Sequence, residues 1–308
     1  MTIAEFHNVE KRYGKTHALE NVSLNFISGQ VTVLLGHNGS GKSTMLKMLA
    51  SLMLPDNGSV SVFNGLNEKT PKLFRKRIGF LFDHNGHFEH LTGYQNAWFF
   101  LSSYGMKKKD ATAARLDELF SWIGLSDKKD DLVATYSYGM RRKLALLEAV
   151  AHKPDLLLLD EPTMGLDYTS RLEFYRLIGD LSQQGVSTVI STNDIYEATI
   201  IGQQIVILKN GKLIANGTPD KLLSEVKKDS KIIVTLMNPI SLIYFEKLLD
   251  ISHIETSENK EGFVLEIMVK PQRNPLPEII FQIVHNRGMI KKIQMEEPNL
   301  ADVYLKNN

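Results

Sequence analysis

The chain has 308 residues, a formal net charge of +1 and no cysteine. This length predicts about two domains, since domains commonly contain ~100–200 residues. Positive and negative charges nearly cancel, which argues against nucleic acid as a partner and requires any anionic ligand to be bound locally. The lack of cysteine excludes a disulfide framework or a thiolate metal site and is compatible with a reducing cytosol.

The first third of the chain alternates short apolar segments with turn signals. Residues 1–10 carry no secretory signal pattern, and no apolar run in the chain approaches the ~20 residues of a membrane span, so we expect a soluble polypeptide. The dipeptides Asn57-Gly58 and Asn64-Gly65 are typical of turns. The pattern predicts strands over Val22–Phe26, Val31–Leu35, Ser59–Phe63 and Ile78–Phe82.

A glycine-rich loop follows the second of these strands. Gly36 and Gly41 frame four residues, Lys42 and Ser43 follow directly, and a helix is expected from Met45. A strand, a glycine loop and a helix N-terminus bring backbone N–H groups around a polyphosphate. Lys42 would reach the β- and γ-phosphates and Ser43 would bind Mg²⁺. The predicted phosphate-binding residues are Gly36, Asn38, Gly39, Ser40, Gly41, Lys42, Ser43 and Thr44.

Helical spacing then dominates from about 84 to 153, before strand patterns return. Apolar residues recur at helix spacing in Tyr94–Tyr104 and Ala111–Ile123. The continuous apolar run Leu156–Leu159 is typical of a strand covered on both faces of a parallel sheet. Further strands are predicted over Ser187–Ser191 and Ile205–Leu208. A helix is predicted over 171–184, between the strand at Leu156–Leu159 and the strand at Ser187–Ser191. The order indicates an α/β nucleotide-binding core with a helical insertion.

Two carboxylates end the apolar run that begins at Leu156. Asp160 would stand at the carboxyl end of the strand, where it can hold Mg²⁺ through water. Glu161 would lie beside it and could polarise an attacking water molecule. The pair therefore favours hydrolysis of the nucleotide over phosphoryl transfer to another substrate.

A second unit is expected to begin near 226. Its pattern predicts a strand, a helix, two strands, a helix and a strand between 231 and 295, followed by a short terminal helix. This βαββαβ order indicates a small ferredoxin-like α+β domain. We therefore expect a nucleotide-binding domain over 1–225 and a second domain over 226–308, whose role would be accessory, regulatory or in dimerisation.

Several motifs together resemble those of ABC transporter ATPases over roughly 3–220. Tyr136-Ser-Tyr-Gly-Met140 is similar to the signature loop that opens a helix in that family, Gly165-Leu-Asp167 to its D-loop, and Tyr13 to the aromatic residue that stacks on adenine. Tyr13 could also be a half-buried strand aromatic. The resemblance implies an ABC-type P-loop NTPase fold, ATP and Mg²⁺ as ligands, and a site shared by two chains. Ser137, Gly139 and Asp167 would then contact the ATP held by the partner chain, which would be a second copy or a paralogue.

A narrower resemblance concerns ATPases that serve ABC-2-type exporters. It rests on the run Tyr136–Lys143, on Leu91–Ala97 and on the tail Glu297–Leu305. The resemblance implies separate transmembrane permease subunits as partners, docked on the helical region after Asp83, and a peripheral location on the cytoplasmic face of a bacterial membrane. The alternative is a soluble ATP switch of the same family that is not coupled to a permease. Such proteins usually carry two cassettes or a long coiled-coil insertion, and this sequence has neither.

Two positions depart from the family pattern. Asp83 stands where the family has the Q-loop glutamine, and Asn193 where it has the switch histidine. Asp83 keeps an oxygen that could bind Mg²⁺ but adds negative charge near the phosphates. Asn193 keeps an amide donor and loses the imidazolium. We therefore expect catalysis by Glu161 and Lys42, with Asp83 and Asn193 slowing it, unless a local rearrangement lets Asn193 do the histidine's work.

Three histidines follow Asp83 at three-residue steps, at His84, His87 and His90. Their spacing differs from the i, i+4 spacing of a helical zinc site. We interpret them as solvated loop histidines near the permease contact.

Overall fold

The computed structural model describes residues 1–82, 86–106, 110–224, 230–245, 251–259, 262–270, 275–296 and 299–306. The chain divides into two compact units, 1–219 and 220–308, and each is described by itself. Within the described ranges, no helix has both the length and the apolar character needed to cross a membrane.

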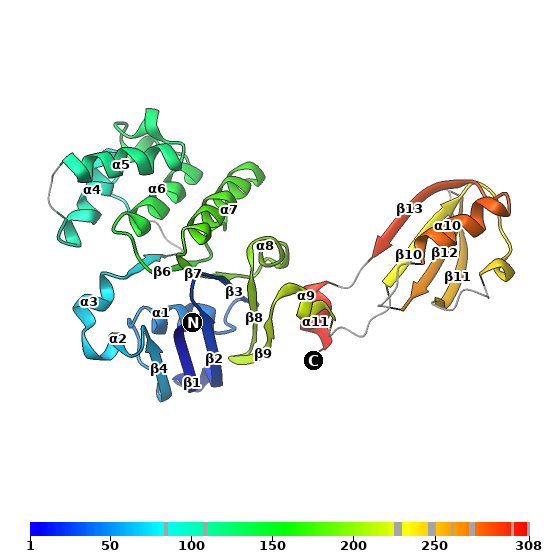
Figure 1. Ribbon diagram of the computed structural model, residues 1–308, viewed down its shortest axis with the longest axis horizontal. Helices are drawn as coiled ribbons and strands as arrows, with labels where there is room; N and C mark the ends of the chain where they lie inside the picture. Colours follow the sequence, from blue (N-terminus) through cyan, green and yellow to red (C-terminus); the bar gives the residue numbers. More distant parts are fainter. Residues whose placement is uncertain are drawn as a thin grey trace. The chain divides into compact units, whose positions relative to one another are not determined.

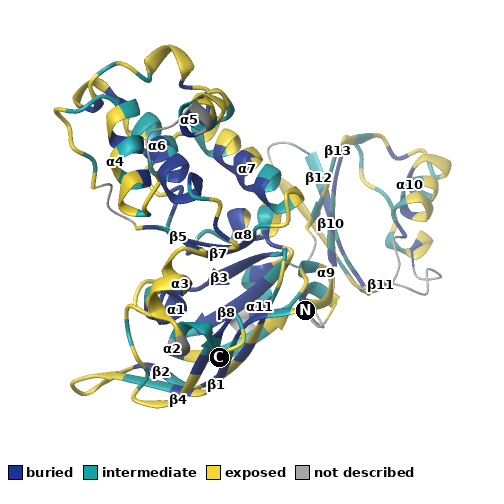
Figure 2. Cartoon of the chain, turned by 60° about the vertical axis from the view of Figure 1, so that its left-hand side comes forward, coloured by how far each residue is buried: buried dark blue, intermediate teal, exposed yellow. Residues whose placement is uncertain are grey.

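The first unit is built on a six-stranded sheet with strand order β5-β6-β7-β3-β8-β9. Neighbouring strands are parallel, except that β8 and β9 are antiparallel. Every residue of β3 is buried, and this strand is dark blue in Figure 2. The predicted α/β core is confirmed, because the central strands β3, β6 and β7 are buried along their whole length, as in a parallel sheet covered on both faces. The strands are β3 (Val31–Leu35), β5 (Ile78–Leu81), β6 (Leu156–Asp160), β7 (Ser187–Thr192), β8 (Gln204–Lys209) and β9 (Lys212–Gly217).

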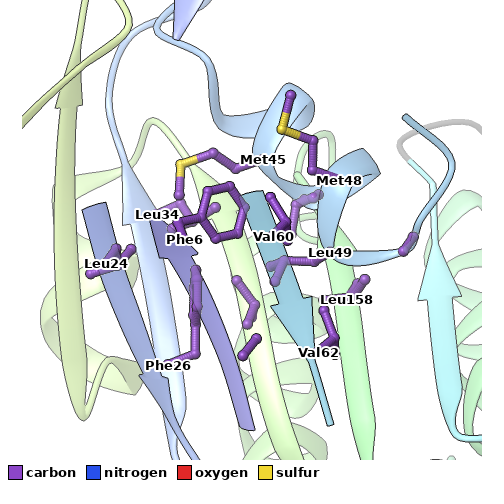
Figure 3. Packing of buried hydrophobic residues seen from close by; sticks show 14 of the residues in the cluster. Phe6, Leu24, Phe26, Leu34, Met45, Met48, Leu49, Val60, Val62 and Leu158 are labelled. Atoms are coloured by element: carbon purple, nitrogen blue, oxygen red, sulfur yellow. The ribbon is translucent and has the colours of Figure 1, made fainter. Parts of the chain in front are cut away.

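A three-stranded antiparallel sheet covers the helix that follows the glycine loop. Its strands are β1 (Thr2–Tyr13), β2 (Thr16–Ile27) and β4 (Asn57–Val62), in the order β2-β1-β4. Figure 3 shows Met45 and Leu49 of α1 (Lys42–Leu49) against Phe6 and other apolar side chains of this sheet, with Leu158 of the parallel sheet in the same cluster. Helix α1 is therefore fixed on both sides, which holds the loop before it in place.

A helical subdomain is inserted between β5 and β6. It contains α4 (Gly93–Ser103), α5 (Asp110–Trp122) and α6 (Tyr138–Val150), with 3-10 turns at Ser126–Lys128 and Val133–Thr135. Figure 1 draws the three helices as one group. Helix α4 begins with a capping box, in which the Thr92 hydroxyl accepts from Gln95 N–H and the Gln95 side chain accepts from Thr92 N–H. The remaining helices of the first unit are α2 (Leu66–Lys69), α3 (Pro71–Arg75), α7 (Tyr168–Gln183) and α8 (Ile195–Ile201).

The second unit contains a four-stranded antiparallel sheet in the order β11-β12-β10-β13. Ile279 and Ile283 of α10 (Leu276–His285) pack on its apolar residues. The described part of the expected first helix is a 3-10 turn at Leu242–Tyr244, and 246–250 lie outside the described residues. The order of strands and helix fits the ferredoxin-like prediction. The other elements are α9 (Pro219–Ser224), β10 (Ser230–Leu236), β11 (Ile251–Asn259), β12 (Gly262–Val269), β13 (Ile290–Glu296) and α11 (Leu300–Lys306).

Candidate functional site

The predicted site residues of the core gather at one edge of the parallel sheet. The glycine loop follows β3, Asp160 ends β6, and Asn193 follows β7. Strand β7 pairs in parallel with both β3 and β6, so the carboxyl ends of the three strands meet. In α/β proteins this edge is where ligands bind.

The glycine loop needs its glycines for two separate reasons. At Gly36, an added Cβ would lie 2.4 Å from the carbonyl oxygen of Leu208, so only glycine fits between the loop and β8. At Gly41, φ is +108°, and a Cβ would lie 2.5 Å from the carbonyl oxygen of Ala18. Residues that carry a side chain are strained at such a positive φ, so glycine is the residue that lets the chain turn directly into α1 at this position. The loop therefore presents its backbone at the N-terminus of α1, as a phosphate ligand requires.

Lys42 connects the loop with the predicted catalytic carboxylate. Its side chain is 5% exposed, and Nζ donates to the carbonyl oxygens of Gly36 at 2.7 Å and His37 at 3.2 Å. Nζ also lies 3.3 Å from Oε1 of Glu161. The ammonium group thus stands between the phosphate loop and Glu161, where it can meet an anion bound to the loop.

Asp160 and Ser43 offer two oxygen atoms to one cation. Ser43 Oγ donates to Asp160 Oδ1 at 3.0 Å, and Ser191 Oγ donates to the same oxygen at 2.5 Å. A hydroxyl and a carboxylate are the hard oxygen ligands that Mg²⁺ prefers. The donor set therefore fits the predicted magnesium site, and Ser191 on β7 orients its carboxylate.

Glu161 is held in an unusual backbone conformation. Its φ is +44°, and its N–H contacts Ser191 at both the carbonyl oxygen (3.2 Å) and Oγ (3.0 Å). Burial raises the pKa of the Glu161 carboxyl, while Lys42 and a hydrogen bond from the Asn193 backbone N–H act in the opposite direction. A carboxylate with a raised pKa accepts a proton from water more readily, as a general base should.

The predicted signature and D-loop residues lie at helix N-termini of the first unit. Ser137 is the N-cap of α6 and accepts from Met140 N–H, and Asp167 is the N-cap of α7 and accepts from Ser170 N–H. The hydrogen bond from Ser170 holds the pKa of Asp167 below its usual value. At Gly139 an added Cβ would meet Ser170 Oγ at 3.1 Å. The exposed N-terminus of α6 can therefore offer N–H groups to an anion brought by another molecule.

The remaining predicted residues are divided between described and undescribed parts of the chain. Tyr13 ends β1, is 49% exposed, and donates from its hydroxyl to Met53 Sδ at 2.9 Å. The side chain of Asn193 is exposed, while its backbone N–H points at Glu161. Asp83 lies outside the described residues.

The interpretation of the three histidines is wrong for His87. Its side chain is only 3% exposed, and Nε2 lies 3.2 Å from Oε2 of the buried Glu148 on α6. Burial raises the pKa of Glu148, and the neighbouring His87 opposes that effect. The sequence pattern missed this burial because the covering residues come from α6, more than fifty positions away. His84 lies outside the described residues, and the described residues contain no group of three potential metal ligands.

The sequence also provided no indication that Arg142 is buried. This side chain of α6 is 0% exposed, and its guanidinium donates to backbone carbonyl oxygens around the end of β6. The run Tyr136–Lys143 marked a family resemblance but carried no signal for such contacts.

Comparison with known proteins places these features in one family. The model of the family described as ABC transporter matches residues 19–164. The daunorubicin resistance ATP-binding protein DrrA3 of Streptomyces coeruleorubidus is 31% identical over 96% of this chain and 92% of its own length. The glutamine transport ATP-binding protein GlnQ of Escherichia coli is 34% identical over 71% of this chain and 92% of its own length.

A solved structure agrees with these relatives. The dimeric structure of MJ0796, a bacterial ABC transporter cassette, is 28% identical, has a TM-score of 0.63, and is matched over 70% of this chain and 98% of its own. ATP binding and hydrolysis follow from the family and from the site at the ends of β3 and β6. The chain therefore belongs to the ATP-binding subunits of ABC transporters, and over nearly its whole length it is similar to a drug-resistance member of that family.

Proposed function

We propose that this chain is the ATP-hydrolysing subunit of a bacterial exporter, bound to a separate ABC-2-type permease on the cytoplasmic face of the membrane. The observation that carries the proposal is the extent of the likeness to its relatives. The similarity to the glutamine transport protein extends over 224 residues, which is close to the 219 residues of the first unit. The resistance protein matches over 296 residues and so extends into the second unit. A cassette with this additional unit is therefore favoured to serve export.

The residues at the sheet edge divide the work of hydrolysis among themselves. The backbone of the glycine loop and Lys42 would bind the phosphates, and Ser43 and Asp160 would hold Mg²⁺, which neutralises charge on the phosphate oxygens. Glu161 would orient the attacking water and accept its proton. Preorganised groups of this kind stabilise charge in the transition state without having to rearrange.

Two copies, or a copy and a paralogue, would complete the site. One chain carries one phosphate loop and one signature helix, and the exposed N-terminus of α6 bears Ser137 and Gly139. In a head-to-tail pair these residues would close over the γ-phosphate held by Lys42 of the other chain. ATP is therefore expected to promote dimerisation, and Asp167 to lie near the contact.

The permease would dock in a groove of about 910 Å³ lined by residues of α3, β5, α4 and α6. Phe80, Phe82 and Phe100 give the groove apolar walls. The exposed basic side chains that line it are Lys72, Arg75 and Lys76. An amphipathic cytoplasmic helix with an apolar face and a carboxylate near one end would complement both features.

Reversing the basic charges of the groove is expected to uncouple the permease. Exposed ion pairs contribute ~0.2–1 kcal/mol each, so Arg75→Glu with Lys76→Glu should weaken binding to the purified permease by about tenfold. Basal ATP turnover should stay within twofold. Binding would be measured by titrating labelled cassette onto the permease in nanodiscs, at low and high salt.

Lys47→Glu is the matched control, because Lys47 is exposed on α1 and does not line the groove. Equal loss in the control would contradict the groove assignment. If no polytopic permease co-purifies with the wild-type chain from membranes, the alternative of a soluble ATP switch would replace the transporter proposal.

Tyr13 is expected to bind the adenine ring. Stacking on an aromatic side chain contributes ~1–3 kcal/mol per base, so Tyr13→Ala should weaken ATP binding by at least about fivefold. Tyr13→Phe should bind ATP almost as well, because it keeps the ring and loses only the contact with Met53. Fluorescent-nucleotide titration would measure both variants. Inorganic tripolyphosphate, which lacks the base, should bind wild type and Tyr13→Ala equally, and an equal loss for both ligands would show that the substitution disturbs the loop instead.

A further inference from the structure

Arg142 is the largest completely buried side chain of the described residues. Its Nη1 donates to the carbonyl oxygen of Phe82 at 2.6 Å, and its Nε donates to that of Pro162 at 2.7 Å. Nη2 donates to the carbonyl oxygens of Asp160 at 3.0 Å and Glu161 at 2.9 Å. One guanidinium thus joins helix α6 to Phe82, which follows β5, and to the last residue of β6 with the two residues after it.

These contacts constrain both partners. Burying a cation is costly unless its donors meet acceptors. The guanidinium is a rigid planar fork of N–H donors, and here it meets carbonyl oxygens of three consecutive residues. Lysine, with a single point of attachment, could not reach all of them. The turn after Asp160 therefore has to keep its shape for Arg142 to remain satisfied.

The turn in question contains the strained residue of the site. A left-handed backbone costs a residue other than glycine roughly 1–2 kcal/mol, so Glu161 must be held at its φ of +44° by its surroundings. Ser191 holds its N–H, and Arg142 holds its carbonyl oxygen. In this conformation the carboxylate lies 3.3 Å from Lys42.

We infer that Arg142 is a positioning residue for ATP hydrolysis, which keeps Glu161 in the left-handed conformation that aims its carboxylate at the phosphate site. Arg142 does not touch the reacting atoms. Its removal would free the Glu161 carbonyl and let the backbone relax towards an unstrained conformation, which swings the carboxylate away from Lys42.

The test separates chemistry from binding in Arg142→Gln and Arg142→Lys. A misplacement of about 1 Å at a catalytic group can cost roughly 100-fold. We expect kcat to fall about 10- to 30-fold in Arg142→Gln and less in Arg142→Lys, which keeps the charge and part of the donor set. The Kd for ATP, measured with fluorescent nucleotide, should stay within twofold. An unchanged kcat in both variants, or a rise in Kd as large as the fall in kcat, would overturn the inference.

A matched control lies one residue away. Arg141 belongs to the same turn of α6, where it pairs with the exposed Glu89 at 2.6 Å and donates to the carbonyl oxygens of Ala134 and Tyr136. None of these contacts involves the turn at Glu161, so Arg141→Gln removes a charge from α6 and leaves that turn in place. Its kcat should stay within twofold of wild type. Thermal unfolding of each variant would show whether it folds, and Arg142→Lys provides a second reading should Arg142→Gln unfold.

A double-mutant cycle distinguishes positioning from general stabilisation. If Arg142 acts through Glu161, adding Arg142→Gln to Glu161→Gln should change the single-turnover rate by less than twofold. A further 10-fold loss in the double variant would refute action through Glu161. The cycle needs no permease, so its failure would leave the transporter proposal intact, and failure of permease binding would leave this inference intact.

Discussion

Replacing Glu161 by glutamine is expected to lower ATP turnover by roughly 100- to 10,000-fold, the range that general acid–base catalysis supplies. The amide keeps the shape of the carboxyl group but cannot accept a proton from the attacking water. ATP binding should change little, because the glycine loop, Lys42 and Ser43 remain in place. The variant should therefore accumulate as an ATP-bound dimer, measurable by size-exclusion chromatography beside phosphate release.

The pH dependence of ATP turnover provides a second test of Glu161 as the general base. Burial raises the pKa of Glu161 above its ordinary value of 4.5. The carboxylate is protonated, and so inactive as a base, below that raised pKa, and turnover should fall as the pH drops through it. The residual turnover of Glu161→Gln should lack this acidic limb. Glu173→Gln is the control, because Glu173 pairs with Lys143 on the surface and should not alter the profile. If Glu161→Gln kept more than a tenth of wild-type turnover, another group would be the base.

The phosphate loop could be predicted from sequence because its requirements are local. Gly36 and Gly41 are needed by close backbone approaches and by a positive φ, and Lys42 follows them within the same short segment. The continuous apolar run before Asp160 likewise identifies a buried parallel strand without any knowledge of its neighbours. The positions of Ser43, Asp160 and Glu161 at one sheet edge follow once the strands are parallel.

Strand β1 escaped prediction because a bulge breaks its alternation. Ala4 and Phe6 are buried two residues apart, but Asn8 adopts a φ of +48° and the next buried residue is Val9. A shift of one residue moves side chains to the other face of a strand, so the period of two is lost. The sequence therefore predicted the two outer strands of this sheet, β2 and β4, and not the central strand β1.

Arg142 and His87 show a different limit of sequence reasoning. Charged and titratable residues are expected at the surface, and both are buried here. Their partners are backbone carbonyl oxygens of Phe82 and 160–162 in one case and Glu148 in the other. Such contacts exist only after the helical subdomain has packed on the sheet. The candidate catalytic groups could thus be proposed from the sequence, while the buried groups that contact them could be identified only from the fold.

Asn193→His is expected to increase basal ATP turnover by roughly 10- to 100-fold. Asn193 follows β7, and its backbone N–H already points at the Glu161 carboxylate, so a side chain at this position borders the phosphate site. A hydrogen bond to a charged group contributes ~1.5–3 kcal/mol, and each 1.36 kcal/mol of transition-state stabilisation is about tenfold in rate. An amide and an imidazole can both donate a hydrogen bond to the γ-phosphate. Only the imidazole can also carry a positive charge.

The comparison requires steady-state phosphate release from wild type, Asn193→His and Asn25→His at saturating ATP. Asn25 is exposed on β2, and its substitution should leave turnover unchanged. The Kd for ATP should be similar in all three, because the added interaction belongs to the transition state and raises kcat rather than affinity. Wild-type turnover at the ordinary rate of the family, with no gain in Asn193→His, would mean that the asparagine already does the work of a histidine. The site would then be a fully active one.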